Sequence, residues 1–294
     1  MNFVKLVKKF KSVIIHKGLI CFVNILQFFS LSLASKFGSV LFVTPFGIAR
    51  PSREKMFYNS AQKKTLRIKS IQKEVEVLSY GYSKKKVLFV HGWAGRSSQI
   101  YVTADKLLEK SYMLISFDGP AHGNSTGKTT SMPEFVYTIL EIDKQLGPFE
   151  VAIGHSFGGL CLYNAISEGL TVKKLITMGT CDKISDIILD FTNKLKLKPI
   201  IAKKIKTIYD KRWQIDIDKH SSSTVAKQVK IPTLVIHDSL DRDVNVSCAV
   251  SIRQNLQKGS LFITQGLGHI KMLRNKSVTE KMISFILDKK HLSN

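Results

Sequence analysis

Val151-Ala152-Ile153-Gly154-His155-Ser156-Phe157-Gly158 is the stretch of this 294-residue chain that decides its fold. It contains the pattern G-x-S-x-G after a short apolar run, and a small-residue helical run, Gly158–Ala165, follows it. Strand, sharp turn and helix in this order expose a serine side chain at the end of the strand. Glycines are needed because side chains beside such a turn collide with neighbouring backbone. The stretch predicts a βα unit with Ser156 as a candidate nucleophile, and the alternative is an ordinary βα turn.

The sequence on both sides of this unit alternates short apolar runs with helical patterns. Thr65–Ile71 and Glu74–Tyr80 alternate in polarity and predict a strand pair. Six further runs suit strands that are buried on both faces, as in a parallel sheet. These runs are Lys86–His91, Tyr112–Asp118, Glu150–His155, Lys174–Gly179, Thr233–His237 and Leu261–Thr264. Alternating β and α units predict an α/β fold with a doubly wound, mainly parallel sheet.

One interval interrupts this alternation. Between Thr180 and Pro232 the chain has no apolar strand run, and Ile184–Leu195 and Ile200–Trp213 look helical. Such an insertion is too long for a simple crossover connection. We therefore expect a helical cap over the sheet, at about residues 181–231.

A serine hydroxyl is a poor nucleophile unless a base takes its proton. His269, in a glycine-bracketed loop just beyond the last predicted strand, is the best placed of the eight histidines. The acid that orients this base is expected after the preceding strand, where Asp238, Asp241 and Asp243 offer three carboxylates. Asp238 is close enough to the strand end to cap the turn, and Asp243 begins the approach to the next helix. Asp241 is preferred, and the other two remain open.

An oxyanion that develops on a substrate needs backbone N–H donors. The first donor is expected at Phe157, immediately after the candidate nucleophile. The second is expected in the loop His91-Gly92-Trp93-Ala94-Gly95, where two glycines allow the backbone to approach a substrate. We predict Trp93 as the second donor, and the alternative is a glycine turn with no catalytic part.

Together these residues resemble the α/β-hydrolase superfamily, and in particular bacterial esterase-type serine hydrolases. The resemblance spans roughly residues 65–290. It rests on Val90–Trp93, Phe117–Ser125, Gly154–Gly158, His237–Asp241 and Gly266–His269. It implies the α/β-hydrolase fold with a cap between the sixth and seventh core strands, a triad of Ser156, Asp241 and His269, and an oxyanion hole at Trp93 and Phe157.

The sequence departs from the family pattern at the acid. Family members often have His-Gly before the acidic loop, whereas this chain has His237-Asp238. This departure is why the choice among the three aspartates stays open. Asp118 and His122 resemble the loop that closes beside the family's site, and we interpret them as structural residues.

A triad with an oxyanion hole implies acyl transfer to water, so the expected substrates are small carboxylic esters or thioesters. Two alternatives are a catalytically silent hydrolase-fold protein used for binding and a lipid-directed lipase or acyltransferase at a membrane surface. The sequence has no phosphate loop, dinucleotide fingerprint or zinc-ligand spacing, so we expect no cofactor and no metal.

Charge and cysteine content restrict the partners and the compartment. The formal net charge is +23, from 45 Lys and Arg against 22 Asp and Glu, and it is spread over the chain. Spread charge favours a solvated surface, and no nucleic-acid-binding motif accompanies it, so nucleic acid is not an expected partner. The four cysteines form no C-x-x-C pair and predict reduced thiols. We expect a cytoplasmic protein that can also associate with membranes.

Residues 1–53 form a basic and apolar segment, set apart from the hydrolase-like region at 54–294. The segment holds eight Lys or Arg and no acidic residue, and Gly18–Ser35 carries no charge. It predicts a helical arm that packs on the rest of the chain or contacts an anionic membrane surface through residues 1–44. A membrane-spanning helix and a secretory signal are the other interpretations.

Overall fold

The computed structural model describes residues 17–47 and 49–288. Its contacts divide the chain into two compact units. Unit 2 comprises residues 44–182 and 219–294, and unit 1 comprises residues 1–43 and 183–218. The candidate site residues named above all lie in unit 2.

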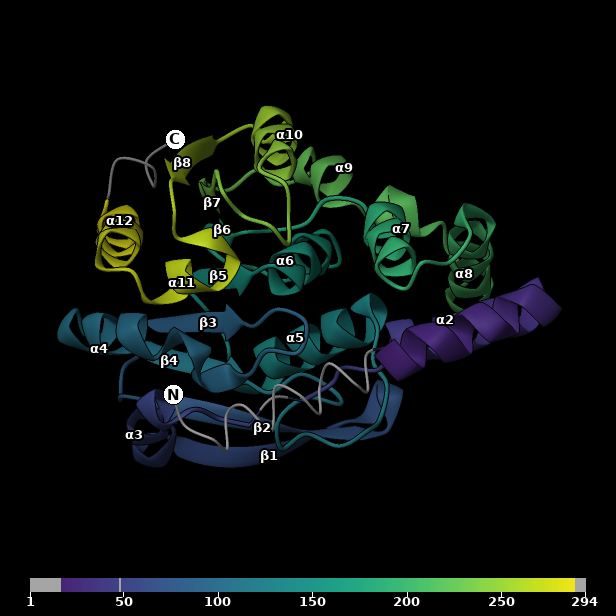
Figure 1. Ribbon diagram of the computed structural model, residues 1–294. Coiled ribbons are helices and arrows are strands. Elements are labelled where there is room, and N and C mark those ends of the chain that lie inside the picture. The colour runs from purple at the N-terminus through teal and green to yellow at the C-terminus, as the bar shows by residue number, and fades with distance from the viewer. Residues whose placement is uncertain (1–16, 48, 289–294) are drawn as a thin grey trace, which may run out of the picture. The chain divides into compact units, whose positions relative to one another are not determined.

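Unit 2 is built on one eight-stranded sheet (Figure 1). Its strands are β1 Gln62–Ile68, β2 Lys73–Tyr80, β3 Lys86–Val90, β4 Met113–Phe117, β5 Val151–His155, β6 Lys174–Met178, β7 Thr233–Asp238 and β8 Gly259–Thr264. The order across the sheet is β1-β2-β4-β3-β5-β6-β7-β8. The pairs β1–β2 and β2–β4 are antiparallel, and all the others are parallel. The predicted mainly parallel sheet is confirmed.

Helices cover both faces of this sheet (Figure 1). One face carries α3 Ser52–Ser60, α4 Tyr101–Glu109 and α12 Lys276–Leu287, and the other carries α5 Met132–Leu146, α6 Phe157–Ser167, α9 Ser222–Ala226 and α10 Ser247–Asn255. Alternate residues of the strands, such as Val87 and Phe89 in β3, have side chains in the hydrophobic core between the sheet and α3, α4 and α12. Leu234 and Ile236 in β7 belong to the same core. This period of two is what a strand dictates, since successive side chains point to opposite faces. Short connecting elements are η1 Lys69–Ile71, η2 Ser97–Ile100, η3 Ile217–His220, α11 Gly268–Lys271 and η4 Met272–Arg274.

Two sequence-based expectations about the strands were wrong. The first strand was expected to reach Ile71, but it ends at Ile68, and a 3₁₀ turn with Gln72 at φ 52° follows. The run Leu261–Thr264 was expected to be buried on both faces, whereas Leu261 and Ile263 of β8 are exposed. The reason is position, because β8 is an edge strand that pairs only with β7.

The described part of unit 1 is helical. Residues 17–29 form a helix, followed by α2 Leu31–Phe42, and the other segment holds α7 Ile184–Lys194 and α8 Pro199–Trp213. The two predicted insertion helices are thus present to within one residue. Asn24 donates to the carbonyl of Leu195, and Gln27 both donates to the carbonyl of Lys196 and accepts from the Lys198 N–H. Within the described ranges, no helix is at once long and apolar enough to cross a membrane.

Candidate active site

Ser156 lies at the turn from β5 into α6 with φ 53° and ψ −121°. A non-glycine residue rarely adopts a positive φ, and the strain persists only where the surrounding structure holds it. The turn is held here because the Ser156 N–H donates to the carbonyl of Met178 on the neighbouring strand. The local geometry is that of a nucleophile elbow, in which the serine projects from the carboxyl edge of the sheet.

The glycines of the motif are explained by close backbone approaches. A Cβ on Gly158 would lie 2.2 Å from the carbonyl oxygen of Val90, and one on Gly154 would lie 2.6 Å from the Cα of Gly159. A Cβ on Gly92, in the loop after β3, would lie 2.9 Å from the Cβ of Ser156. Helix α6 can therefore start directly beside β3 only if these positions lack side chains.

His269 lies in the short helix α11 after β8, Asp241 lies in the loop after β7, and the two side chains meet at the same sheet edge. The Nδ1 of His269 donates to Oδ2 of Asp241 over 2.7 Å, and the Asp241 carboxylate is fully buried. Burial alone raises the pKa of Asp241, but the hydrogen bonds from His269 and from the N–H groups of Val244 and Asp243 outweigh it and lower this pKa. Asp241 therefore stays ionised, and a proton fixed on Nδ1 leaves Nε2 of His269 free to accept one.

The position of this pair depends on Gly179, a residue that no sequence motif marks. Gly179 follows β6 at φ 56°, and a Cβ there would lie 3.1 Å from Nδ1 of His269 and 3.5 Å from Oδ2 of Asp241. A side chain would therefore press on the His269–Asp241 hydrogen bond. The signal in the sequence is a glycine at the carboxyl end of a buried strand, which is common enough to be overlooked.

The other two aspartates of the loop make different contacts. Asp238 is buried and accepts hydrogen bonds from Thr264 Oγ1 and from the N–H groups of Leu240 and Leu267. Burial acts to raise the pKa of Asp238, but these and neighbouring hydrogen bonds lower it to about 2. Asp243 is exposed. Asp238 thus ties the end of β7 to the loop that carries His269, and the hydrogen bond to the histidine ring belongs to Asp241.

His155, the residue before the serine, holds the backbone of His269 through a hydrogen bond. Its Nε2 donates to the carbonyl of His269 over 3.0 Å, and the two rings lie 4.8 Å apart. Complete burial lowers the pKa of His155 to about 3, so the ring is neutral. The sequence shows that this residue adjoins the serine but gives no sign of this contact. Its partner is 114 residues away in the chain.

The two expected oxyanion donors, Trp93 and Phe157, also meet. Their rings are in edge-to-face contact with centroids 5.4 Å apart, although Trp93 lies in the loop after β3 and Phe157 begins α6. Among the described residues, neither backbone N–H has a hydrogen-bond acceptor. Phe157 is the first residue of α6, so its N–H lies at the positive end of the helix dipole. Two unsatisfied donors near Ser156 are what an oxyanion site requires.

Two neutral histidines hold the loop that carries Trp93. The Nε2 of His122 accepts from the Ala94 N–H over 3.0 Å, and the Nε2 of His91 accepts from the Gly119 N–H over 2.8 Å. In both rings Nδ1 donates to a backbone carbonyl, of Pro120 and Gly92 respectively. Burial lowers the pKa of His91 to about 4 and that of His122 to about 3. Each ring is therefore neutral and can accept from an N–H.

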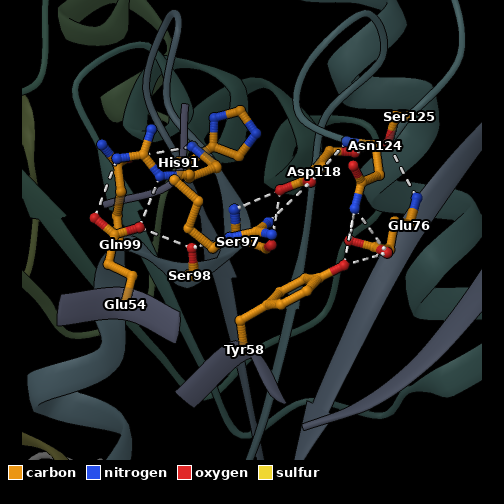
Figure 2. A network of polar contacts seen from close by, with 12 residues as sticks. Glu54, Tyr58, Glu76, His91, Ser97, Ser98, Gln99, Asp118, Asn124 and Ser125 are labelled. Atoms are coloured by element: carbon orange, nitrogen blue, oxygen red, sulfur yellow. Dashed lines mark hydrogen bonds and ion pairs between the residues drawn. The ribbon is translucent and has the colours of Figure 1, made fainter. Parts of the chain in front are cut away.

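A buried polar network continues from this loop (Figure 2). Asp118 accepts from the N–H and hydroxyl of Ser97 at 2.7 Å each and from the Asn124 N–H at 3.0 Å. Arg96 donates twice to Glu54, which also accepts from Ser98. These contacts join the loop after β3 to α3 and to the loop after β4. They give Asp118 a structural role in positioning the loop after β3.

Asp241, Asp243 and His269 place possible metal-ligand atoms within 4.8 Å of one another, and in the part of the chain that the structure describes they form the one such group. The Asp241–His269 hydrogen bond already accounts for two of the three positions, and Asp243 is exposed. A metal ion would have to replace that hydrogen bond. The geometry is fully explained by an imidazole held by a carboxylate.

Comparisons with known proteins bear on this arrangement. A family profile described as "alpha/beta hydrolase fold" matches residues 85–205. An esterase from Exiguobacterium antarcticum superposes with a TM-score of 0.62 and 18% identity, over 77% of this chain and 100% of its own. The chain has the α/β-hydrolase fold. A search of curated proteins finds no match to the sequence.

Other hydrolase-fold structures resemble the chain to a similar degree. A bromoperoxidase from Bacillus anthracis has a TM-score of 0.60 and 17% identity, over 77% of this chain and 100% of its own. A membrane phospholipase A, described as a bacterial virulence factor, has a TM-score of 0.60 and 14% identity, over 97% of this chain and 98% of its own. Proteins with different names share the fold at these low identities, so the likeness determines the fold and leaves the substrate open.

Proposed function

We propose that this hydrolase-fold protein is a serine hydrolase that cleaves carboxylic esters or thioesters through an acyl-enzyme on Ser156. The observation that carries the proposal is the buried 2.7 Å hydrogen bond between His269 and Asp241 at the sheet edge from which Ser156 projects. Such a pair fixes the tautomer of the base and stabilises the imidazolium that forms during attack. The roles of the three residues are those that the resemblance to α/β-hydrolases implies.

The reaction follows from these positions. Oγ of Ser156 attacks the carbonyl carbon of the substrate, and its proton passes to Nε2 of His269. The N–H groups of Trp93 and Phe157 stabilise the oxyanion of the tetrahedral intermediate. Collapse of the intermediate breaks the bond to the alcohol or thiol, which leaves with the proton from His269. Water then repeats the attack on the acyl-enzyme, and the carboxylic acid is released.

Covalent labelling tests this proposal. Wild-type protein is incubated with a fluorophosphonate probe, and the modified peptide is identified by mass spectrometry. We expect modification of Ser156, and loss of labelling in Ser156→Ala but not in Ser239→Ala, which removes an exposed serine from the acid loop. Labelling at another residue, or none with folded wild-type protein, would overturn the proposal and favour a catalytically silent binding protein.

A lipid-directed lipase or acyltransferase is a second candidate. It is supported by apolar side chains exposed on the helices of residues 17–42, and by the likeness to a membrane phospholipase A over nearly the whole chain. A series of p-nitrophenyl esters from acetate to palmitate separates the candidates. A small-ester hydrolase loses turnover as the chain lengthens, whereas a lipid-directed enzyme gains it when the substrate is presented in vesicles. If a second alcohol is added, formation of its ester identifies acyl transfer.

A further inference from the structure

Both helices of residues 17–42 expose several large apolar side chains, and the buried positions of α2 are small residues. The buried positions of α2 are Ala34, Ser35, Gly38 and Ser39. A Cβ on Gly38 would lie 3.1 Å from Cδ1 of Ile205 on α8, so the two helices pack closely at these small residues. In a water-exposed helix the apolar stripe normally faces the core and the polar face is exposed. Helix α2 departs from this pattern, because its buried positions are small residues whereas Leu33 and Val40 are exposed.

The exposed side chains are spaced so that they share a face of each helix. In the helix of residues 17–29, Phe22, Ile25 and Phe29 lie at i, i+3 and i+7, with Phe28 beside them, and in α2, Leu33 and Val40 lie two turns apart. The ring of Phe22 contacts that of Phe37 in α2, with centroids 5.2 Å apart, so the two helices are adjacent there. Phe28 and Phe29 are 83% and 79% exposed. We call Phe22, Ile25, Phe28, Phe29, Leu33 and Val40 the apolar stripe.

Exposed lysines accompany the stripe within unit 1. Gln27, next to Phe28, bonds to the backbones of Lys196 and Lys198 in the α7–α8 turn, so this turn lies beside the helix that carries the stripe. The side chains of Lys196 and Lys198 are exposed, as are Lys17 and Lys36 on the stripe helices and Ile200 at the start of α8. Exposed lysines therefore lie on the helices that carry the apolar stripe and in the turn beside one of them.

The acidic residues of unit 1 do not cancel this charge. Its described residues contain eleven Lys or Arg against five Asp. Three of the five aspartates form ion pairs with Lys206, and a fourth pairs with Lys194. The surface that remains is apolar and positively charged, which is complementary to an anionic lipid surface and not to water or to a neutral protein face.

We infer that the apolar stripe docks unit 1 onto an anionic membrane surface, with Phe28 and Phe29 inserted at the headgroup level and Lys196 and Lys198 against the lipid phosphates. Helices of this kind lie in the plane of the interface and gain from apolar burial and from attraction to anionic lipid together. Asn24 and Gln27, which interrupt the apolar segment in the sequence, face the α7–α8 turn and satisfy its backbone groups. Polar residues on that side are compatible with a helix that lies on the membrane.

Vesicle co-sedimentation of the full chain tests the docking. We expect binding to vesicles that contain phosphatidylglycerol, weaker binding to pure phosphatidylcholine, and weakening with added salt. Phe28→Ser with Phe29→Ser is expected to lower the apparent affinity about tenfold or more. The matched control is Met56→Ser with Tyr82→Ser in unit 2, where the two side chains are 77% and 85% exposed, and its affinity is expected to be unchanged. Equal loss in both double variants would overturn the proposal.

The contribution of Lys196 and Lys198 to vesicle binding is tested separately. Lys196→Gln with Lys198→Gln is expected to lower the affinity for anionic vesicles roughly tenfold and to flatten its salt dependence. Lys227→Gln with Lys230→Gln removes the same charge from an exposed part of unit 2 and is the control. If the two pairs have equal effects, overall charge and not this surface causes the binding, which contradicts the proposal.

Cys21 reports where the contact occurs. It is exposed one residue before Phe22, Cys161 and Cys181 are buried, and Cys248 is removed as Cys248→Ser. An environment-sensitive fluorophore on Cys21 is expected to shift to shorter wavelength when anionic vesicles are added. The absence of a shift would overturn the proposal. Concentration-dependent self-association that the Phe28 and Phe29 changes abolish would also overturn it, and would identify a second copy of the chain as the occupant. None of these measurements uses turnover, and Ser156→Ala is expected to bind vesicles as wild type does.

Discussion

The nucleophile elbow and the acid loop lie at the same edge of one sheet but are specified in different ways. At the elbow, one local motif supplies both the proposed nucleophile and the glycines that make its backbone geometry possible. In the acid loop, three aspartates occur within six residues, and their local positions favour Asp241 without excluding the other two. Contacts from residues far along the chain separate them, since Asp238 binds the backbone of Leu267 and Asp241 binds the ring of His269.

This difference shows which kind of sequence motif predicts a site residue reliably. A strained turn excludes most residue types at several adjacent positions, so its sequence is diagnostic. A hydrogen-bonded carboxylate only needs its partner to arrive at about 2.7 Å, and any nearby aspartate can meet that condition if the loop folds accordingly. The following substitutions test each region against the other, from the largest expected effect to the smallest.

Removal of the elbow hydroxyl is expected to have the largest effect. Ser156→Ala should lower kcat on an activated ester about 10⁴-fold or more, because no other group can form the acyl-enzyme. Turnover of p-nitrophenyl acetate measures this, and the thermal unfolding midpoint shows that the fold is intact. Ser239→Ala, in the acid loop, should retain wild-type turnover. A Ser156→Ala protein as active as wild type would contradict the assignment of the elbow.

In the acid loop, Asp241→Asn is expected to lower kcat about 10³-fold. The amide cannot stabilise the imidazolium, and it can stabilise the wrong tautomer of His269. Asp243→Asn removes the same charge from an exposed position two residues away and should change kcat less than about threefold. If Asp243→Asn proves the more damaging, the hydrogen bond to Asp241 is not the one used in catalysis.

The support of the oxyanion loop is expected to matter less than the groups that react. His122→Ala leaves the Ala94 N–H without its acceptor and should lower kcat about tenfold, with KM changed less, because Trp93 then moves relative to the intermediate. His122→Gln can present a carbonyl oxygen to the same N–H and should recover part of the loss. Equal kcat in the alanine variant and wild type would show that His122 only fills space.

The smallest effect on turnover, with a clear effect on stability, is expected at Asp238. Asp238→Asn should lower the free energy of unfolding at pH 7 by about 2 kcal/mol, because charge-assisted hydrogen bonds to the His269 loop are weakened. The pKa of Asp238 is lowered to about 2 from 3.8, so its ionised form stabilises the fold above pH 4. This stabilisation by the ionised carboxylate is lost as the pH falls from about 4 to below 2. Denaturant unfolding of both proteins at pH 7 and pH 3 should show a smaller difference at pH 3.

The sequence by itself determined the parts that depend on local pattern. The spacing of apolar residues predicted the parallel sheet and the two insertion helices. A strand or helix with a buried face must place apolar residues at the spacing of its own geometry. The motif around Ser156 gave the elbow, since only glycines fit its close contacts. His269 was predicted as the base from the order of the strand-end loops, because parallel strands bring their carboxyl ends to one edge.

Only the tertiary structure decided what depends on a distant partner. It distinguished Asp241 from Asp238, gave His155 and His122 their hydrogen bonds, and placed Gly179 against the histidine. It also decided which side of the helices at residues 17–42 faces outward, which the composition of an apolar segment with few charges leaves open. The physical reason is common to all of them. A hydrogen bond or a buried face requires two partners. The sequence contains both partners, but only the folded chain shows that they are in contact.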